Sequence, residues 1–188
     1  EKELSGGLRE AVFVLAPKAL AGKAKAAVEV RYPKGGNTTH WVALEYRGGP
    51  LPLAAVGPIH ANQNVGAPRP GRNIVGSGLK INDKPYVNGF GCFAPSLQEY
   101  ALNKQFKTFS ADVGVDAATE GKGSVVFEIY GDGKRLWASP VMSGLDAVKH
   151  VDLPVEVVDR LRLVVTDGGD GNRYDAADWC EGELKIED

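Results

Sequence analysis

The feature that most constrains this chain is the alternation of apolar and polar residues in short segments. In "SVVFEIY" (124–130), Val125, Phe127 and Ile129 fall on one side of an extended strand. The segment is followed by "GDGK", a tight turn whose glycines tolerate positive φ, and then by "RLWAS". This order predicts a β-hairpin over residues 124–139.

The same period of two recurs in other short segments that are separated by Gly, Asp or Asn. The expected inward-facing residues are Phe109, Ala111, Val113 and Val115; Val151, Leu153 and Val155; Leu161, Leu163 and Val165; and Leu184 and Ile186. Short strands with turn residues between them indicate an all-β fold, an antiparallel β-sandwich, rather than a βαβ fold.

The first fifty residues differ from the rest. Their segments "EAVFVLAP", "KAAVEVRYP" and "HWVALEYRGG" each look like a strand, and "GGPLPL" (48–53) resembles a linker. We expect a small N-terminal β appendage, or the tail of a preceding domain, over 1–50 and the sandwich over 51–188. Extra strands on the main sandwich are the alternative. A polar loop rich in Gly, Asn and Pro follows at 60–78 and is long enough to carry function.

The charge and hydropathy of the chain exclude some partners. The net charge of −2 gives no electrostatic reason to expect a nucleic acid partner. No apolar run approaches the ~20 residues of a membrane-spanning helix. The chain begins at Glu1 without Met, so we expect a piece of a longer protein from which a secretion signal could have been removed.

The one strongly acidic region is the C-terminal stretch that begins at Asp167. It contains the loop "DGGDGNRYDAAD", whose side-chain oxygens come from Asp167, Asp170, Asn172, Asp175 and Asp178. Glycines between them let the backbone curl, and a cation such as Ca²⁺ takes about six to eight oxygens from such a loop. The spacing allows a cation site, and it also allows a solvated loop of Asx turns.

Motifs of known catalytic sites are lacking in the sequence. There is no GxSxG and no HExxH, and no carboxylate pair stands out among the 24 acidic residues. The three histidines, His40, His60 and His150, lie in unrelated contexts. We therefore do not expect an enzyme.

Aromatic residues and cysteines leave two questions open. Sugars stack their C–H faces on aromatic rings beside polar groups, and Tyr174 and Trp179 lie at a polar loop. Trp179 also starts a strand, so it could be a core residue or a ligand platform. The two cysteines, Cys92 and Cys180, form no CxxC motif, which argues against zinc and leaves either two buried thiols or one disulfide.

Several blocks together resemble the NPCBM family of carbohydrate-binding modules over residues 54–186. These blocks are "GFGCFAPS", "FSADVGVD", "SVVFEIYGDG" and "VVTDGGDGNRYDAADW", and "VGPIHANQNVG" resembles the opening of the module. The resemblance implies a jelly-roll, galactose-binding-like sandwich without catalytic activity. It implies binding of terminal galactose or a related glycan, and attachment to a glycoside hydrolase in a longer protein.

The resemblance also implies a structural Ca²⁺ ion and a place for the glycan. The candidate cation ligands are Asp116, Asp167, Asp170, Asn172 and Asp175. The candidate carbohydrate-binding residues are Asn64, Arg72, Asn73, Arg173, Tyr174 and Trp179, from two loops expected at one end of the fold.

The chain departs from the family pattern at positions that matter for the site. Phe93 and Ala176 stand where the family usually has histidine, so a structural or protein–protein interaction module that has lost the sugar site is the second interpretation. Cys92 and Cys180 lie in strands that the family fold would place side by side. The resemblance therefore implies a Cys92–Cys180 disulfide and a secreted or extracytoplasmic location.

Overall fold

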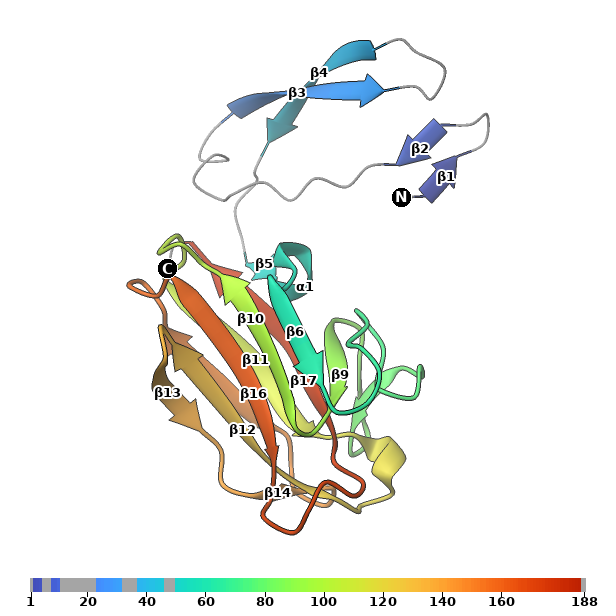
Figure 1. Ribbon diagram of the computed structural model, residues 1–188, viewed down its shortest axis with the longest axis vertical. Coiled ribbons are helices and arrows are strands. Elements are labelled where there is room, and N and C mark those ends of the chain that lie inside the picture. The colour runs from blue at the N-terminus through green and yellow to red at the C-terminus, as the bar shows by residue number, and fades with distance from the viewer. Residues whose placement is uncertain (1, 5–7, 11–22, 32–36, 46–49, 187–188) are drawn as a thin grey trace. The chain divides into compact units, whose positions relative to one another are not determined.

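A computed structural model describes residues 2–4, 8–10, 23–31, 37–45 and 50–186 of the chain (Figure 1). The chain divides into two compact units, Glu1–Gly48 and Gly49–Asp188.

Two antiparallel strand pairs make up the described part of the first unit. Strands β1 (Lys2–Leu4) and β2 (Leu8–Glu10) form one pair. Strands β3 (Lys23–Arg31) and β4 (Asn37–Glu45) form the other, with nine residues paired on each side. They correspond to the second and third strands expected here, and most of "EAVFVLAP" lies outside the described residues.

The second unit is built from two antiparallel sheets. Its elements in chain order are β5 (Leu51–Pro52), α1 (Leu53–Val56), β6 (His60–Gln63), β7 (Leu79–Ile81), β8 (Lys84–Tyr86), β9 (Gly89–Phe93), β10 (Ser96–Ala101), β11 (Thr108–Val115), a 3-10 helix (Ala117–Thr119), β12 (Ser124–Gly131), β13 (Lys134–Ala138), β14 (Met142–Ser143), β15 (Lys149–Pro154), β16 (Arg160–Asp167) and β17 (Ala176–Lys185). The first sheet has the order β13-β12-β16-β10-β6, with β14 beside β12. The second has the order β15-β11-β17-β5, with β9 also paired to β17.

These two sheets face one another and enclose the core, which confirms the predicted antiparallel sandwich. Figure 1 looks onto the first sheet, with β11 and β17 of the second sheet behind it. Val125, Phe127 and Ile129 have no exposed surface, as the alternation of their segment predicts. Phe127 of the first sheet meets Trp179 of the second edge to face, with ring centroids 5.2 Å apart and an interplanar angle of 85°.

The hairpin predicted over 124–139 is formed by β12 and β13. Gly131 pairs with Lys134, and the two turn residues Asp132 and Gly133 have φ of 50° and 82°. Positive φ at both central positions gives the turn the twist that a two-residue hairpin needs.

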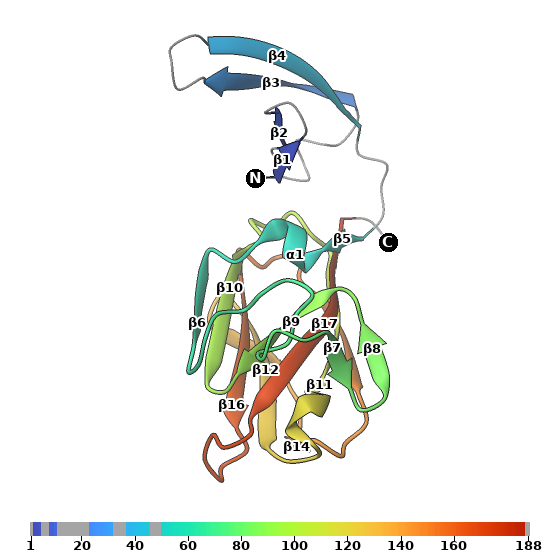
Figure 2. The same cartoon turned by 90° about the vertical axis from the view of Figure 1, so that its right-hand side faces the viewer.

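A second layer of side chains covers the outer face of the second sheet. The hairpin of β7 and β8 lies beside β17 and β11 (Figure 2), and Leu79, Ile81 and Tyr86 form a small apolar cluster with Cys180 of β17. The contact is close because Gly114 has no side chain: a Cβ there would lie 2.5 Å from Ile81 Cγ2. This layer makes β17 buried on both faces.

The predicted disulfide is wrong, because the two cysteines point to opposite faces of one sheet. Cys92 lies opposite Ala177, and Cys180 lies opposite Gly89, so the two are three steps out of register on neighbouring strands. An odd offset turns one side chain inward and the other outward, and three steps span roughly 10 Å, which is too far to bridge. Cys92 accordingly packs in the main core, Cys180 packs under the hairpin, and both thiols are free.

Within residues 50–186 and the described strands of the first unit, no helix is long and apolar enough to cross a bilayer.

Asp112 of β11 ties the covering hairpin to the second sheet. Its carboxylate accepts hydrogen bonds from Lys84 Nζ (2.9 Å) and Tyr86 OH (2.9 Å) of β8, and it lies 2.8 Å from His150 Nδ1 of β15. Burial opposes the charged form of Asp112, but the three partners outweigh it and hold the pKa of Asp112 below its ordinary value.

We expect Asp112→Asn to lower the free energy of unfolding by about 1–3 kcal/mol, because the part-buried Tyr86 hydroxyl and the exposed Lys84 ammonium both lose a charged acceptor. A depressed carboxyl pKa stabilises the fold above the pKa of the unfolded chain, so this contribution fades as the pH falls below about 4. Urea unfolding from pH 3 to pH 7 measures both effects. Asp152→Asn, at an exposed aspartate of β15, is the matched control. Equal stability of the two variants at pH 7 would contradict the assignment.

Candidate functional site

An open hollow lies on the outer face of the first sheet of the second unit. We call it the outer hollow. It has a volume of about 350 Å³ and is lined by Asn62, Gln63, Asn64, Pro95, Ser96, Leu97, Val164, Val165 and Thr166. These residues come from the ends of β6, β10 and β16, which run side by side in Figure 1. Ligand sites occupy roughly 300–1,000 Å³, so the hollow has the size of a small ligand such as one sugar ring.

The outer hollow combines an apolar floor with polar sides. Leu97 pairs with Val164 across β10 and β16, and both are only partly buried. Asn62 lies beside Leu97 on β6, and Asn64 follows at the exposed end of the strand. Amide groups beside an apolar surface suit a sugar, whose C–H face needs apolar contact and whose hydroxyls need hydrogen-bond partners.

The charged groups next to the outer hollow are already paired. Glu99 and Arg162 form the next outward-facing pair on β10 and β16, and the Glu99 carboxylate binds Arg162 Nε and Arg160 Nη1, the latter at 2.7 Å. These hydrogen bonds, Arg162 first, hold the pKa of Glu99 below its ordinary value. The hollow itself is lined by uncharged residues, which favours a neutral ligand.

The acidic loop adjoins the outer hollow at the same end of the sandwich. Asn64 donates its N–H to the carbonyl of Pro95 (3.0 Å), and Ala94 donates its N–H to the carbonyl of Asp175 (3.0 Å). The two loops expected at one end of the fold therefore meet through residues 94–95.

Within the acidic loop, two of the candidate cation ligands, Asp170 and Asp175, bind Ser124. Its N–H donates to Asp175 Oδ1 (2.9 Å), and its hydroxyl donates to Asp170 Oδ1 (2.7 Å). Burial raises the pKa of Asp175, and the charges of Asp170 and Asp167 raise it further against the Ser124 hydrogen bond. Asn172 is an exposed residue of the same loop.

Asp116 does not join this cluster, so the five-residue cation site predicted from sequence is wrong in that member. Its side chain accepts from the N–H of Ala118 (2.7 Å) and from Asn73 Nδ2 (3.2 Å). It also lies against Asp178, whose pKa is raised well above its ordinary value by burial and then by the hydrogen bond and charge of Asp116. Among the described residues, no three His, Cys, Asp or Glu side chains are arranged to hold a metal.

Two of the six residues proposed to bind the glycan are buried, which is a correction. Trp179 is 1% exposed and packs in the core on Phe127, so it cannot be a ligand platform. Asn73 is 5% exposed; its Oδ1 accepts from the N–H of Ser77 (2.8 Å) while its Nδ2 donates to Asp116. The loop can come this close because a Cβ at Gly91 would lie 2.5 Å from Asn73 Cα.

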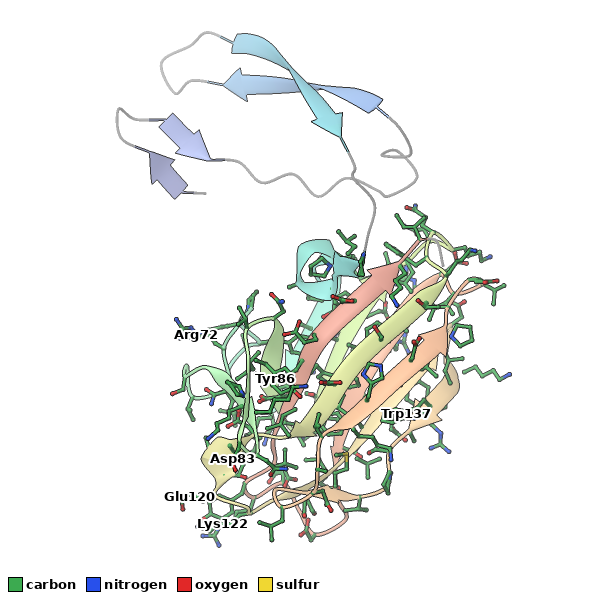
Figure 3. The ribbon with its side chains drawn as sticks, turned by 180° about the vertical axis from the view of Figure 1, so that it is seen from behind. Arg72, Asp83, Tyr86, Glu120, Lys122 and Trp137 are labelled. Carbon is green, nitrogen blue, oxygen red and sulfur yellow. The ribbon has the colours of Figure 1, made fainter. Side chains whose placement is uncertain are left out.

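The other four residues are exposed but do not form one site. Asn64 lines the outer hollow, whereas Arg72 lies on the loop that precedes β7. Figure 3 shows Arg72 well away from Lys122, which lies over the ring of Tyr174 with Nζ 5.1 Å from the ring centroid. Arg173 Cζ lies at the same distance, so Tyr174 is flanked by two cations.

The two departures from the family pattern are direct neighbours. Phe93 of β9 and Ala176 of β17 pair across the two strands, so their side chains share one face. Ala176 is buried and Phe93 is partly exposed. The ring of Phe93 therefore lies beside the methyl group of Ala176, at the two positions where the family resemblance leads us to expect histidines.

Sequence reasoning missed Asn62, Leu97, Val164 and Thr166, although one signal was available. Val164 is the outward residue between Arg162 and Thr166 in "RLRLVVTD", where a polar residue would be expected. An apolar side chain on the solvent face of a strand marks either a covered surface or a binding surface.

The fold and its relatives place this chain among known modules. The NPCBM/NEW2 domain family matches residues 51–185. Alpha-1,3-galactosidase B of Akkermansia muciniphila is 33% identical over 126 residues, which cover 65% of this chain and 16% of that protein. A protein of Renibacterium salmoninarum is 32% identical over 128 residues, which cover 68% of this chain and 8% of that protein. The chain thus spans less than a fifth of either relative.

Solved structures show the same sandwich. The CBM51 from Clostridium perfringens GH95, in complex with methyl-galactose, superposes with a TM-score of 0.69 at 27% identity, over 73% of this chain and all of that one. The M60 catalytic domain with the CBM51-1 and CBM51-2 domains from Clostridium perfringens ZmpB superposes with a TM-score of 0.68 at 25% identity, over 88% of this chain and 18% of that one. The likeness confirms the galactose-binding-like sandwich. Through residues 51–185, the chain belongs to the NPCBM/NEW2 domain family.

Proposed function

We propose that the second unit is a non-catalytic carbohydrate-binding module whose glycan site is the outer hollow. The observation that supports this most directly is the pairing of an apolar floor, Leu97 and Val164, with the amides of Asn62 and Asn64 in a hollow of sugar size. Membership of the NPCBM/NEW2 domain family and the likeness to a module bound to methyl-galactose support the same reading.

Galactose or a related neutral glycan is the ligand class that we propose. The hollow is lined by uncharged side chains and is shallow, which suits the end of a glycan chain rather than an enclosed small molecule. A shallow site with few hydrogen bonds binds weakly, so its use would be to hold an attached enzyme at its substrate. We propose that this enzyme is a glycoside hydrolase domain of a longer, extracytoplasmic protein, since the relatives are far longer than this chain.

A structural or protein–protein interaction role is the second candidate. It is favoured by Phe93 and Ala176, which give an apolar pair where the family resemblance leads us to expect two histidines. A module that bound no glycan but formed a stable complex, broken by Phe93→Asp, would support this role over the first.

We propose that a structural Ca²⁺ ion binds in the acidic loop at Asp167, Asp170 and Asp175. The Asp175 side chain is fully buried, and its Oδ2 has no hydrogen-bond partner among the described residues. Ca²⁺ takes carboxylate and main-chain oxygens, and Gly169 and Gly171, with φ of 96° and 89°, curl the backbone of this loop. The carboxylates supply too few oxygens alone, so main-chain carbonyls would complete the shell.

For the glycan site, we expect Asn62→Ala and Asn64→Ala each to weaken the binding of methyl galactoside by roughly 5–10-fold, the effect of about 1 kcal/mol for one hydrogen bond. Calorimetric titration measures the affinity. Asn88→Ala, at an exposed asparagine that bonds Glu181, is the control and should bind as the wild type does. Loss of binding in Tyr174→Ala, with Asn62→Ala unaffected, would move the site to the acidic loop.

For the cation site, we expect added Ca²⁺ to raise the thermal midpoint of unfolding and EDTA to reverse the rise. Ligand at about 100 times its Kd stabilises a fold by about 2.7 kcal/mol. Asp175→Asn should abolish the response, and Asp83→Asn, at an exposed aspartate, should keep it. A midpoint that is the same with Ca²⁺ and EDTA would rule the site out.

A further inference from the structure

A second, smaller hollow opens at the edge of the sandwich, and no part of the proposed function uses it. We call it the proline cleft. Its volume is about 60 Å³, and its principal walls are Pro58, Pro68, Pro70, Phe90, Gln98 and Tyr100. The chain between β6 and β7 crosses this edge (Figure 2), and Pro70 pairs with Phe90 of β9 to hold it there.

The polar group of the proline cleft is the carboxamide of Gln98. Gln98 is 0% exposed and lies on β10, between Leu163 of β16 and Ala61 of β6. Neither its Nε2 nor its Oε1 finds a hydrogen-bond partner among residues 50–186. Most buried amides in proteins are paired, so an unpaired one that lines an open cleft points to a ligand that pairs with it.

The walls limit what such a ligand can be. No charged residue lines the proline cleft, so the group that enters is neutral. Proline and aromatic rings surround the carboxamide, so the group also carries apolar surface. A carboxamide offers one acceptor and two donors, which a group with both an N–H and a carbonyl can match.

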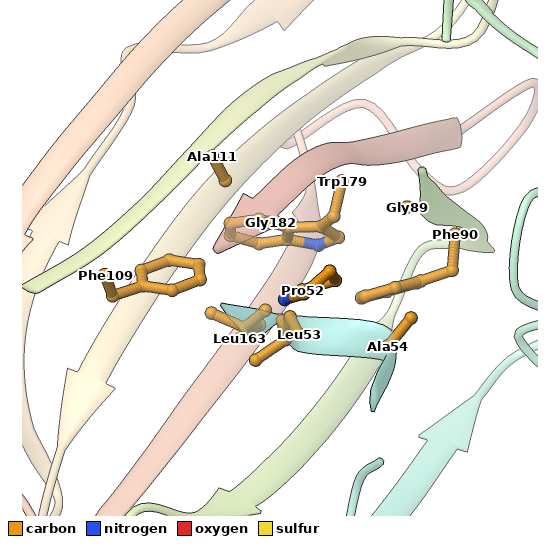
Figure 4. A pocket seen from close by; sticks show the side chains of 10 residues that line it. All are labelled: Pro52, Leu53, Ala54, Gly89, Phe90, Phe109, Ala111, Leu163, Trp179 and Gly182. Carbon is orange, nitrogen blue, oxygen red and sulfur yellow. The ribbon is translucent and has the colours of Figure 1, made fainter. Parts of the chain in front are cut away.

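The size of the cleft excludes a whole sugar ring. A separate space of about 10 Å³, lined by Trp179, Phe109 and Leu163, shares Ala54 and Phe90 with the cleft (Figure 4). That space has room for one water molecule, so it does not extend the cleft. Only a substituent enters, while the ring that carries it stays outside.

We propose that the proline cleft binds the acetamido group of an N-acetylated sugar, with its amide on Gln98 and its methyl group against the prolines and Phe90. The site is separate from the outer hollow, because successive residues of a strand face opposite sides: Leu97 faces the hollow and Gln98 faces the cleft. This inference does not depend on the glycan that the outer hollow takes.

The test compares matched sugars and one substitution. Calorimetry is done with the methyl glycosides of N-acetylgalactosamine and galactose, and of N-acetylglucosamine and glucose. We expect each acetamido sugar to bind at least about 10-fold more tightly than its partner, because a buried polar group left unpaired penalises the analogue that lacks the group. Gln98→Met keeps the volume and removes the amide, so it should abolish the preference.

Gln105→Met is the matched control, because the Gln105 Oε1 is also buried without a partner among the described residues but lies outside the cleft. It should keep the preference. Gln98→Met should not lower the thermal midpoint, since it removes an unpaired amide. Ala54→Leu, at an exposed residue that lines the cleft, adds volume there without replacing Gln98 and should abolish the preference as well.

The outcomes separate this site from the outer hollow. An acetamido preference that survives in the double variant Asn62→Ala/Asn64→Ala and vanishes in Gln98→Met supports the proline cleft. Equal affinity for the matched sugars in the wild type overturns the proposal, and so does a preference that persists in Gln98→Met and Ala54→Leu. A marked drop in the thermal midpoint of Gln98→Met would show a structural role for Gln98 and overturn it too.

Discussion

The pairing of β17 is the constraint on which the rest of the second unit depends. This ten-residue strand bonds to β11, β9 and β5, and both of its faces are covered. Its inward residues, Ala177 and Trp179, close the core against the first sheet. Its outward residues, Asp178 and Cys180, lie beneath the covering layer. A slip of one residue would exchange these two sets, placing a carboxylate in the core and an indole under the hairpin.

The alternation of side chains between the two faces of a strand explains which predictions from sequence were confirmed. Period-two alternation found the strands of the first sheet, because their outer face meets solvent and leaves polar residues between apolar ones. It could not assign Trp179, because β17 is buried on both faces and its pattern does not say which face meets the core. The disulfide prediction was wrong for a related reason. The sequence indicated that the strands of Cys92 and Cys180 are neighbours, but it did not indicate that their register turns the two side chains to opposite faces of the sheet.

Other parts of the site depend on contacts between residues far apart in the sequence. Asn73 and Asp116 are 43 residues apart, and only the absence of a side chain at Gly91 lets the loop settle between the strands and bring them together. Sequence composition marked both as polar loop residues, which fits a ligand site and a buried hydrogen bond equally well. The outer hollow was missed because its floor uses residues that look like ordinary strand positions. The acidic loop stands out by composition alone; in the structure Asp170 and Asp175 bind Ser124, whereas Asp116 faces Asn73 and Ala118.

The unpaired state of Cys92 and Cys180 has a consequence for how this unit holds together. No covalent link joins β9 to β17 within the described residues, so their cohesion rests on main-chain pairing and on side-chain packing from both faces. Burial raises the pKa of the Cys92 thiol to about 12, which leaves it almost entirely in its unreactive protonated form. Formation of the sandwich therefore requires no oxidant and includes no step that waits for a disulfide between these two cysteines.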